Sequence, residues 1–378
     1  MAARAPEDRK AKRKRRNGFV EFGNAILTFV VLAIIAAGAV GFYGLQQFLA
    51  TGPKAEETAF VVEKDSGLSS VAARLESQGL ISNQLVFVLA GKVMRKDRDI
   101  KLGQFTVPAN ASMSDILDLI TEGKPVEFFI TVPEGETSFQ VAERIRQSSN
   151  SLTGELTTDP REGSILPGRY DWVFSTDTRQ SVLDQMQARM KQALTKAWAG
   201  RDTSIDDVIK TPEDLLTLAS LVERETALAS EHATVASVFI NRLRKGMRLQ
   251  TDPSVLYGLT LGKTVMNRGP TSKELRTETP YNTYIIAGLP PGPIANPAET
   301  TLAAVAHPAQ TNYLYFVAQT ARPADGHYFA ATYAEHRKNV AKYRQAVKAA
   351  QAQAEIEADD AKEALEAEQA QQAGDTTQ

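Results

Sequence analysis

Hydrophobic residues form one long uninterrupted run near the N-terminus. The segment Phe22–Leu45 carries no formal charge and consists mainly of Ala, Val, Ile, Leu and Phe. A helix of roughly 20 apolar residues is long enough to cross a bilayer. We therefore predict one transmembrane helix over residues 22–45, followed by a polar linker over residues 46–58.

Basic side chains are concentrated in the segment before this run, residues 1–21. Short basic flanks remain in the cytoplasm, so we expect the N-terminus inside and the rest of the chain outside. A cleaved signal peptide is the alternative, but its apolar core is shorter, about 7–15 residues. Beside a membrane span, the cluster is better explained as a topology signal than as a nucleic-acid site. Its members are Arg4, Arg9, Lys10, Lys12, Arg13, Lys14, Arg15 and Arg16.

A strand–turn–helix pattern then occurs three times, over Val62–Val71, Val107–Ile116 and Val132–Val141. Each copy has a strand end, a turn, a small residue suited to cap a helix, and apolar residues at helical spacing. The unit resembles LysM, a small β-α-α-β glycan-binding module, and we predict a LysM-like domain over residues 59–127. Such a unit is also common in protein cores, so glycan contact stays open.

The rest of the chain predicts an α+β domain and a tail. Residues 128–345 mix strands, helices and turn-rich segments, whereas residues 346–378 are mostly Ala, Glu, Gln and Lys and predict an exposed helix or a disordered tail. The net charge of −2 argues against a polyanionic partner such as nucleic acid, and the absence of cysteine excludes disulfides and thiolate chemistry.

Two glutamates lie at the end of a well-defined predicted helix. Thr211 caps it and Pro212 occupies its first turn. Glu223 and Glu225 fall on opposite flanks of its apolar face, so they do not face each other as an acid–base pair. A carboxyl group among apolar neighbours has a raised pKa, which suits a general acid. The helical periodicity alone does not choose between the two.

A second helix is predicted from Glu231 to Lys245, with Ser230 as its cap and Gly246 past its end. Asn241 and Arg242 interrupt its apolar face, and an interhelix hydrogen bond would account for Asn241. A polar Gln-Thr-Asp-Pro turn follows at residues 250–253.

Several segments, in order, resemble the YceG-like family, the endolytic murein transglycosylases called MltG. The resemblance covers about residues 60–343 and includes the apolar anchor. The segments are REGSILPGRYDWVF, LASLVERETALAS, VFINRLRKGMRLQTDPSVLYG, TPYNTYIIAGLPPGPIANP and LYFVAQTARPADGHYFA.

The resemblance implies an enzyme of the bacterial inner membrane with its catalytic domain, residues 128–345, outside the cytoplasm. Such an enzyme cuts the β-1,4 bond between N-acetylmuramic acid and N-acetylglucosamine within nascent peptidoglycan strands, and synthases of those strands are implied partners. The family pattern V-E-x-E makes Glu223 the catalytic acid. Residues implied to bind substrate are Glu162, Tyr170, Asn241, Gln250, Asp252, Tyr281 and Asn282.

One carboxylic acid is enough for lytic cleavage, because the 6-hydroxyl of the sugar attacks in place of water. Most other glycosidases need two carboxylates. A muramidase that uses water, with Asp252 as the second carboxylate, and a non-enzymatic wall-binding scaffold are the alternatives. No cofactor or metal is expected: Gly258–Thr264 is one residue too short for a phosphate loop, and the histidines lack metal-ligand spacing.

Overall fold

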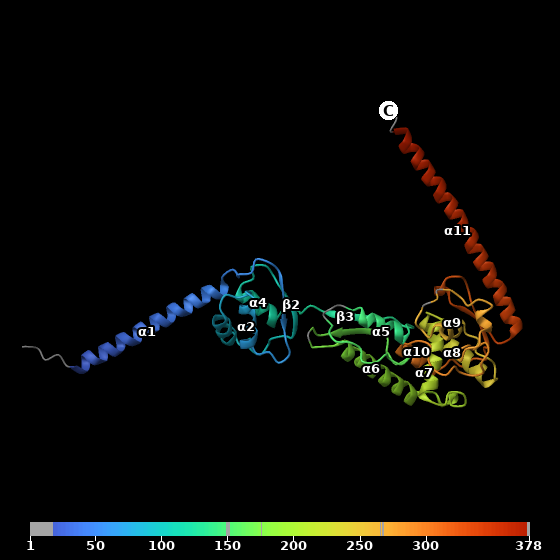
Figure 1. The fold of residues 1–378 in the computed structure, drawn as a ribbon, viewed down its shortest axis with the longest axis horizontal. Coiled ribbons are helices and arrows are strands. Elements are labelled where there is room, and N and C mark those ends of the chain that lie inside the picture. The colour runs from blue at the N-terminus through green and yellow to red at the C-terminus, as the bar shows by residue number, and fades with distance from the viewer. Residues whose placement is uncertain (1–17, 149–151, 175, 265, 267, 376–378) are drawn as a thin grey trace, which may run out of the picture. The chain divides into compact units, whose positions relative to one another are not determined.

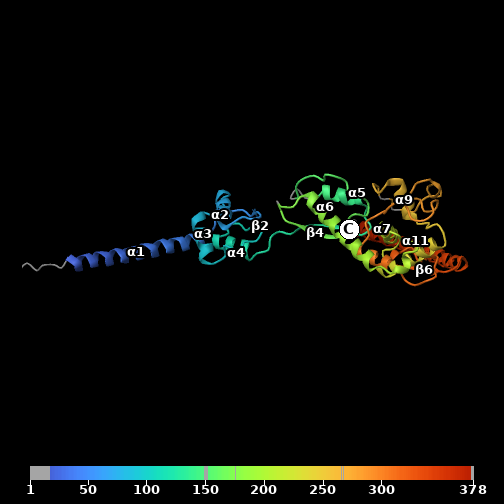
Figure 2. The same ribbon diagram turned by 90° about the horizontal axis from the view of Figure 1, so that it is seen from below.

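The computed structural model describes residues 18–148, 152–174, 176–264, 266 and 268–375 (Figures 1 and 2). The chain forms two compact units, Met1–Val126 and Glu127–Gln378. The sequence predicts a domain boundary one residue further along, between residues 127 and 128. The basic cluster at positions 4–16 lies outside the described residues.

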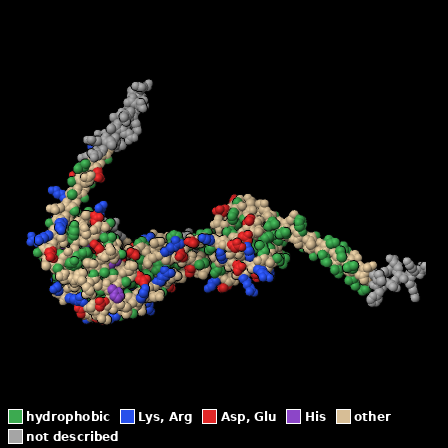
Figure 3. All heavy atoms as spheres, turned by 180° about the vertical axis from the view of Figure 1, so that it is seen from behind, with side chains coloured by type: hydrophobic (Ala, Val, Ile, Leu, Met, Phe, Trp, Pro, Cys, Tyr) green, Lys and Arg blue, Asp and Glu red, His purple; other side chains and the backbone are tan. Residues whose placement is uncertain are grey.

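The N-terminal helix α1 spans Gly18–Leu49, and its part from Phe22 to Leu49 is long and apolar enough to cross a membrane. Hydrophobic side chains cover the described part of its surface (Figure 3). The helix continues four residues beyond the predicted end at residue 45, so residues 46–49 belong to it and not to the linker. The reason is packing: Phe48 is buried in the core of the first unit.

After α1, the first unit has the order β-α-α-β. Strands β1 (Thr58–Val62) and β2 (Gly103–Val107) pair antiparallel, and helices α2 (Leu68–Ser77) and α3 (Gln84–Val93) lie between them in the chain. Helix α4 (Met113–Thr121) follows. Their apolar faces form one core. The predicted order of elements is present, and the LysM-like glycan-binding role stays a prediction.

The second unit is a mixed α+β structure, as predicted. It has two antiparallel two-stranded sheets, β3–β4 and β5–β6. Its elements are β3 (Phe128–Val132), α5 (Ser138–Arg146), β4 (Gly168–Trp172), α6 (Arg179–Gly200), η1 (Thr203–Ile205), α7 (Pro212–Glu225), α8 (Ala229–Arg244), α9 (Asp252–Thr260), η2 (Glu274–Arg276), α10 (Glu299–Ala306), β5 (Tyr315–Ala318), η3 (Pro323–Asp325), β6 (His327–Ala330) and α11 (Tyr333–Asp375).

The predicted strand–turn–helix repeat is confirmed at β1–α2, β2–α4 and β3–α5. Each copy has a left-handed residue three positions after the strand end and a helix N-cap five positions after it. The left-handed residues are Asp65 (φ 60°), Asn110 (φ 59°) and Gly135 (φ 73°). The N-caps are Gly67, Ser112 and Thr137, and the last two form full capping boxes.

Helix α6 connects the two hydrophobic clusters of the second unit. Its first half, including Met186, packs on the β3–β4 sheet and α5. Its second half, including Met190, packs with α7, α8 and α10 in the larger cluster. These three helices contact one another, and α7 is the central one because its apolar face is fully buried.

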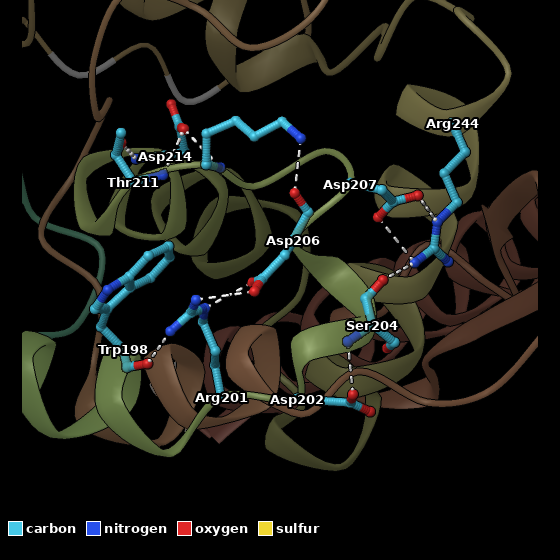
Figure 4. A network of polar contacts seen from close by, with 10 residues as sticks. Trp198, Arg201, Asp202, Ser204, Asp206, Asp207, Thr211, Asp214 and Arg244 are labelled. Carbon is cyan, nitrogen blue, oxygen red and sulfur yellow. Dashed lines mark hydrogen bonds and ion pairs between the residues drawn. The ribbon is translucent and has the colours of Figure 1, made fainter.

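Local capping fixes where α7 begins. Thr211 and Asp214 form a capping box, and Pro212 occupies the first helical position, as predicted. The preceding loop is held by a polar network in which Arg201 binds Asp206, and Arg244 from the end of α8 binds Asp207 (Figure 4).

The structure changes two predictions about where helices begin and end. Ser230 does not cap α8, because the helix begins one residue earlier, at Ala229, with Leu228 as an N-cap that makes no side-chain hydrogen bond. Helix α11 is continuous to Asp375, and its side chains from Lys348 to Ala358 are exposed.

Candidate active site

The two glutamates at the end of α7 have different surroundings. Glu225 is the last residue of the helix, and the chain leaves it in an extended conformation at Thr226. Helix α8 begins at Ala229, so only residues 226–228 connect it to the end of α7. Both glutamates are half-buried.

Glu223 is used as a hydrogen-bond acceptor at the beginning of α10. Its Oε2 atom accepts from the backbone N–H of Ala298 at 2.9 Å and from the hydroxyl of Thr301 at 2.5 Å. Thr301 also contacts Nδ1 of the buried His232 at 3.0 Å. A carboxylate at a helix N-terminus satisfies free N–H groups and interacts favourably with the helix dipole. This geometry gives Glu223 a structural role between α7 and α10.

Glu225 is held in a way that favours its neutral form. Burial, helped by the nearby charge of Asp252, raises its pKa to about 7 against the opposing effects of Thr251, Arg242 and Arg224. The hydroxyl of Thr251 is buried there without a hydrogen bond of normal geometry in the described chain. A carboxyl group with a pKa near neutrality can donate a proton and later take one back.

The Gln250–Asp252 segment lies beside Glu225 because a second loop holds it. The backbone N–H of Gln250 donates to the carbonyl of Thr283 at 3.1 Å, and that of Thr251 donates to the Thr283 hydroxyl at 2.9 Å. The Tyr284 hydroxyl donates to Asp252 Oδ1 at 2.6 Å. Asp252 is therefore an exposed carboxylate at the start of α9, oriented by the Tyr284 hydroxyl.

Two hollows flank the end of α7. One, of about 300 Å³, is lined by Arg224, Asp252 and Tyr257 among others. The other, of about 240 Å³, is lined by Glu225, His327 and Tyr343 among others.

Of the residues that the sequence suggests for substrate binding, Asp252 lies near Glu225, and Gln250 is two residues before it in the same segment. Glu162 and Tyr281 lie together in another cluster, around Tyr257, whose ring centroid is 4.8 Å from that of Tyr281. Burial raises the pKa of the Glu162 carboxyl, although it accepts from the Ser138 N–H at 2.8 Å. Tyr257 lines the 300 Å³ hollow, whereas Glu162 and Tyr281 contact Tyr257 and are not among the lining residues of that hollow.

Three suggested residues are structural in this fold. Tyr170 is 1% exposed, and its hydroxyl donates to the carbonyl of Leu166. Asn282 is fully buried, and its Nδ2 donates to two backbone carbonyls of the η2 segment. Asn241 uses its Nδ2 in the same way, on the carbonyls of Thr311 and Tyr313, which fits the alternative of a structural hydrogen bond. Tyr170 and Asn282 are thus enclosed in the described structure, and the substrate-binding role that the resemblance implies for them stays a prediction.

Sequence reasoning missed Thr251, Tyr284 and the buried Arg242. The Arg242 guanidinium donates to the carbonyls of Leu314 at 2.7 Å and Leu249 at 2.6 Å, so it ties α8 to β5 and to the Gln250–Asp252 segment. The sequence did contain an indication of this role, because Arg242 is a charged residue that interrupts the apolar face of its helix. Thr251 and Tyr284 stand inside quoted motifs, but nothing marked them among their polar neighbours.

Comparison with known proteins identifies the family to which this α+β chain belongs. The chain belongs to the YceG-like family, whose profile matches residues 60–342. The resemblance seen in the sequence is thereby confirmed.

Relatives in this family carry an enzyme name. A protein of Streptococcus pneumoniae serotype 2, strain D39, called endolytic murein transglycosylase, is 27% identical over 366 residues, which are 84% of this chain and 65% of the relative. The protein of the same name from Bacillus subtilis strain 168 is 30% identical over 312 residues, 75% of this chain and 83% of the relative. This chain thus spans 65% of the length of the pneumococcal relative.

A solved structure is also similar. The crystal structure of a YceG-like protein from Listeria monocytogenes has 27% sequence identity to this chain and a TM-score of 0.48. The match covers 75% of this chain and 98% of the Listeria chain.

The raised pKa of Glu225 predicts a pH-dependent stability difference for Glu225→Gln. In the unfolded chain this carboxyl ionises near pH 4.5, but in the folded protein only near pH 7, so ionisation between these values weakens the folded state. The glutamine variant avoids that cost. Its gain in unfolding free energy should be near zero below pH 4.5, grow through this window, and reach at most about 3 kcal/mol above pH 7.

Denaturant unfolding of both proteins at pH 4, 6 and 8 measures this difference. A variant that is equally stable relative to the wild type at all three values would contradict the buried, neutral carboxyl group described for Glu225.

Proposed function

We propose that this protein is a membrane-anchored endolytic transglycosylase of peptidoglycan, and that Glu225 is its catalytic acid. The observation that carries the proposal is the Glu225 carboxyl group at the end of α7, which has a pKa of about 7 and lines the 240 Å³ hollow. Support comes from the family and from relatives called endolytic murein transglycosylase.

The assignment of the acid differs from the one that the family pattern suggests. Glu223 remains the alternative, but its Oε2 atom already accepts two hydrogen bonds from the start of α10. To donate a proton to a substrate, Glu223 would use its other oxygen, Oε1, while Oε2 keeps the contacts that join α7 to α10. Glu225 makes no contact of this kind with α10 in the described structure, and burial raises its pKa to about 7.

The proposed reaction uses one carboxyl group twice. Neutral Glu225 gives its proton to the oxygen that leaves with N-acetylglucosamine as the bond from C1 of N-acetylmuramic acid to this oxygen breaks. The Glu225 carboxylate then takes the proton of the 6-hydroxyl, whose oxygen bonds to C1 and closes a 1,6-anhydro ring. No water is consumed, and Glu225 ends as it began. Asp252 and Gln250, beside it, would bind polar groups of the sugars.

Location and partners form a further part of the proposal. The apolar helix from Phe22 to Leu49 would anchor the chain in the bacterial inner membrane, and the basic flank would keep the N-terminus in the cytoplasm. The first unit would contact glycan, and the synthases that extrude new strands at this membrane face would be neighbours. External protease on oriented membranes should digest both units; their protection would contradict this topology.

Digestion of long uncross-linked glycan strands tests the proposed activity. We expect the mean strand length to fall early, because cuts occur within strands, and we expect the new muramic ends to be 1,6-anhydro sugars in mass spectra. New reducing ends would indicate a muramidase and would make Asp252 the candidate second carboxylate. Intact strands would favour a non-enzymatic scaffold.

A further inference from the structure

A large groove in the second unit lies along the free edge of strand β3. Its volume is about 860 Å³. The consecutive residues 127–131 line one side of the groove. Successive side chains of a strand point to opposite faces, so a groove lined by all five residues runs along the edge of the strand and not over one face. In the described part of the chain β3 pairs only with β4, so its other edge has unpaired N–H and C=O groups. Helix α5 forms the opposite side, with Phe139, Gln140 and Glu143.

The groove is continuous with the hollow that Arg224 and Asp252 line. Glu136 and Gln140 line both the 860 Å³ groove and the 300 Å³ hollow that contains Arg224 and Asp252. Lys263, in the groove, directly follows Gly262, in the hollow. An extended molecule that passes Asp252 can therefore continue into the groove without leaving the surface of this unit.

Aromatic side chains give the groove flat apolar surfaces. Phe129 is 49% exposed, with the Arg169 guanidinium over its ring at 3.7 Å from the centroid, and the rings of Phe128 and Trp172 are stacked with centroids 6.0 Å apart. The Trp172 side chain is 7% exposed, and its indole N–H has no hydrogen-bond partner among the described residues.

The polar part of the groove suits an amide-bearing sugar. An acetamido group is a secondary amide with one N–H and one C=O, and an unpaired strand edge offers the matching acceptor and donor. The carboxylates of Glu127 and Glu143 and the amide of Gln140 can bind sugar hydroxyls. Aromatic faces beside such groups are suited to the apolar faces of sugar rings.

We propose that this groove, defined by residues 127–131, the exposed side of α5, Trp172 and Lys263, is a distal subsite for the N-acetylated glycan strand. This inference rests on the proposed function. A strand long enough to reach this subsite would make contacts away from the cleaved bond, so long strands should bind with higher affinity than short ones. An endolytic enzyme needs such a hold, since it must bind a strand in its interior and not at an end.

Variants of the full-length protein in detergent test the subsite. Phe129→Ala combined with Phe139→Ala should lower the ratio of kcat/KM for long strands to kcat/KM for tetrasaccharides by roughly tenfold, through a higher KM for long strands. The matched control is Val173→Ala, an exposed apolar residue next to β4 that does not line the groove. It should keep the wild-type ratio. Unfolding curves check that the double variant is folded.

Fluorescence of Trp172 tests binding without turnover. The chain has two tryptophans, so Trp198→Phe leaves Trp172 as the only one. Long uncross-linked strands should change its emission at lower concentration than tetrasaccharides do, and the Phe129/Phe139 double variant should weaken this response. Free stem peptide that gives the same change would make the groove a peptide site and overturn the proposal.

The two failures are distinguishable. If the wild type cleaves strands but the double variant keeps its length ratio and Trp172 does not respond, the subsite is wrong and the activity stands. If the wild type cleaves strands of neither length, the proposed function fails, and the fluorescence titration still decides whether the groove binds glycan.

Discussion

Replacement of Glu225 by glutamine is expected to lower the rate of strand cleavage by about 10²–10⁴, the usual contribution of a general acid. Glutamine has the same shape and fits the same buried position, but it has no acidic proton to give to the leaving oxygen. The variant should fold normally and, above pH 7, be more stable than the wild type. Cleavage rates on long uncross-linked strands, measured beside unfolding curves, check both statements.

Glu223→Gln is the matched control on the same helix. It should lower the stability of the second unit, because one acceptor of the Ala298 N–H and the Thr301 hydroxyl is altered. Where it is folded, it should cleave strands much faster than Glu225→Gln does. A folded Glu223→Gln that is inactive, beside an active Glu225→Gln, would return the catalytic role to Glu223.

Asn296→Ala is expected to destabilise the second unit by about 3–5 kcal/mol. The fully buried Asn296 Oδ1 accepts from the Ser138 hydroxyl and the Ile165 N–H, and its Nδ2 donates to the Glu136 carbonyl. Alanine would leave these buried groups without partners. The loss should appear as a lower midpoint in denaturant unfolding and a lower Tm.

Asn312→Ala is the control for this prediction. Asn312 is exposed in the loop before β5, so its removal should change stability by less than about 0.5 kcal/mol. Equal effects of the two substitutions would mean that the hydrogen bonds of Asn296 do not hold the β3–α5 turn to the segment before α10.

Local signals were sufficient for much of the fold. The capping box at Thr211, the proline after it and the apolar spacing along α7 depend only on neighbours in the chain, and all three are present in the structure. The strand–turn–helix repeat was visible for the same reason, since its offsets are short. Ser230 shows the limit, because the helix begins before it with Leu228 as an N-cap that makes no side-chain hydrogen bond, and no local polar residue marks that start.

The choice between Glu223 and Glu225 could not be made locally. It depends on α10, whose first residues lie about 75 positions further along and reach Glu223 but not Glu225. The enclosed positions of Tyr170 and Asn282 could not be predicted for a related reason. A polar residue in a motif can serve a substrate or a buried backbone carbonyl, and only the packed structure reveals which one it contacts.

Cleavage of long uncross-linked strands in water enriched in ¹⁸O tests the central claim most directly. If the wild type is a transglycosylase, the new muramic ends should be 1,6-anhydro sugars without ¹⁸O, and Glu225→Gln should produce almost none of them in the same time. New reducing ends that carry ¹⁸O, or normal anhydro products from Glu225→Gln, would contradict a lytic reaction in which Glu225 is the acid.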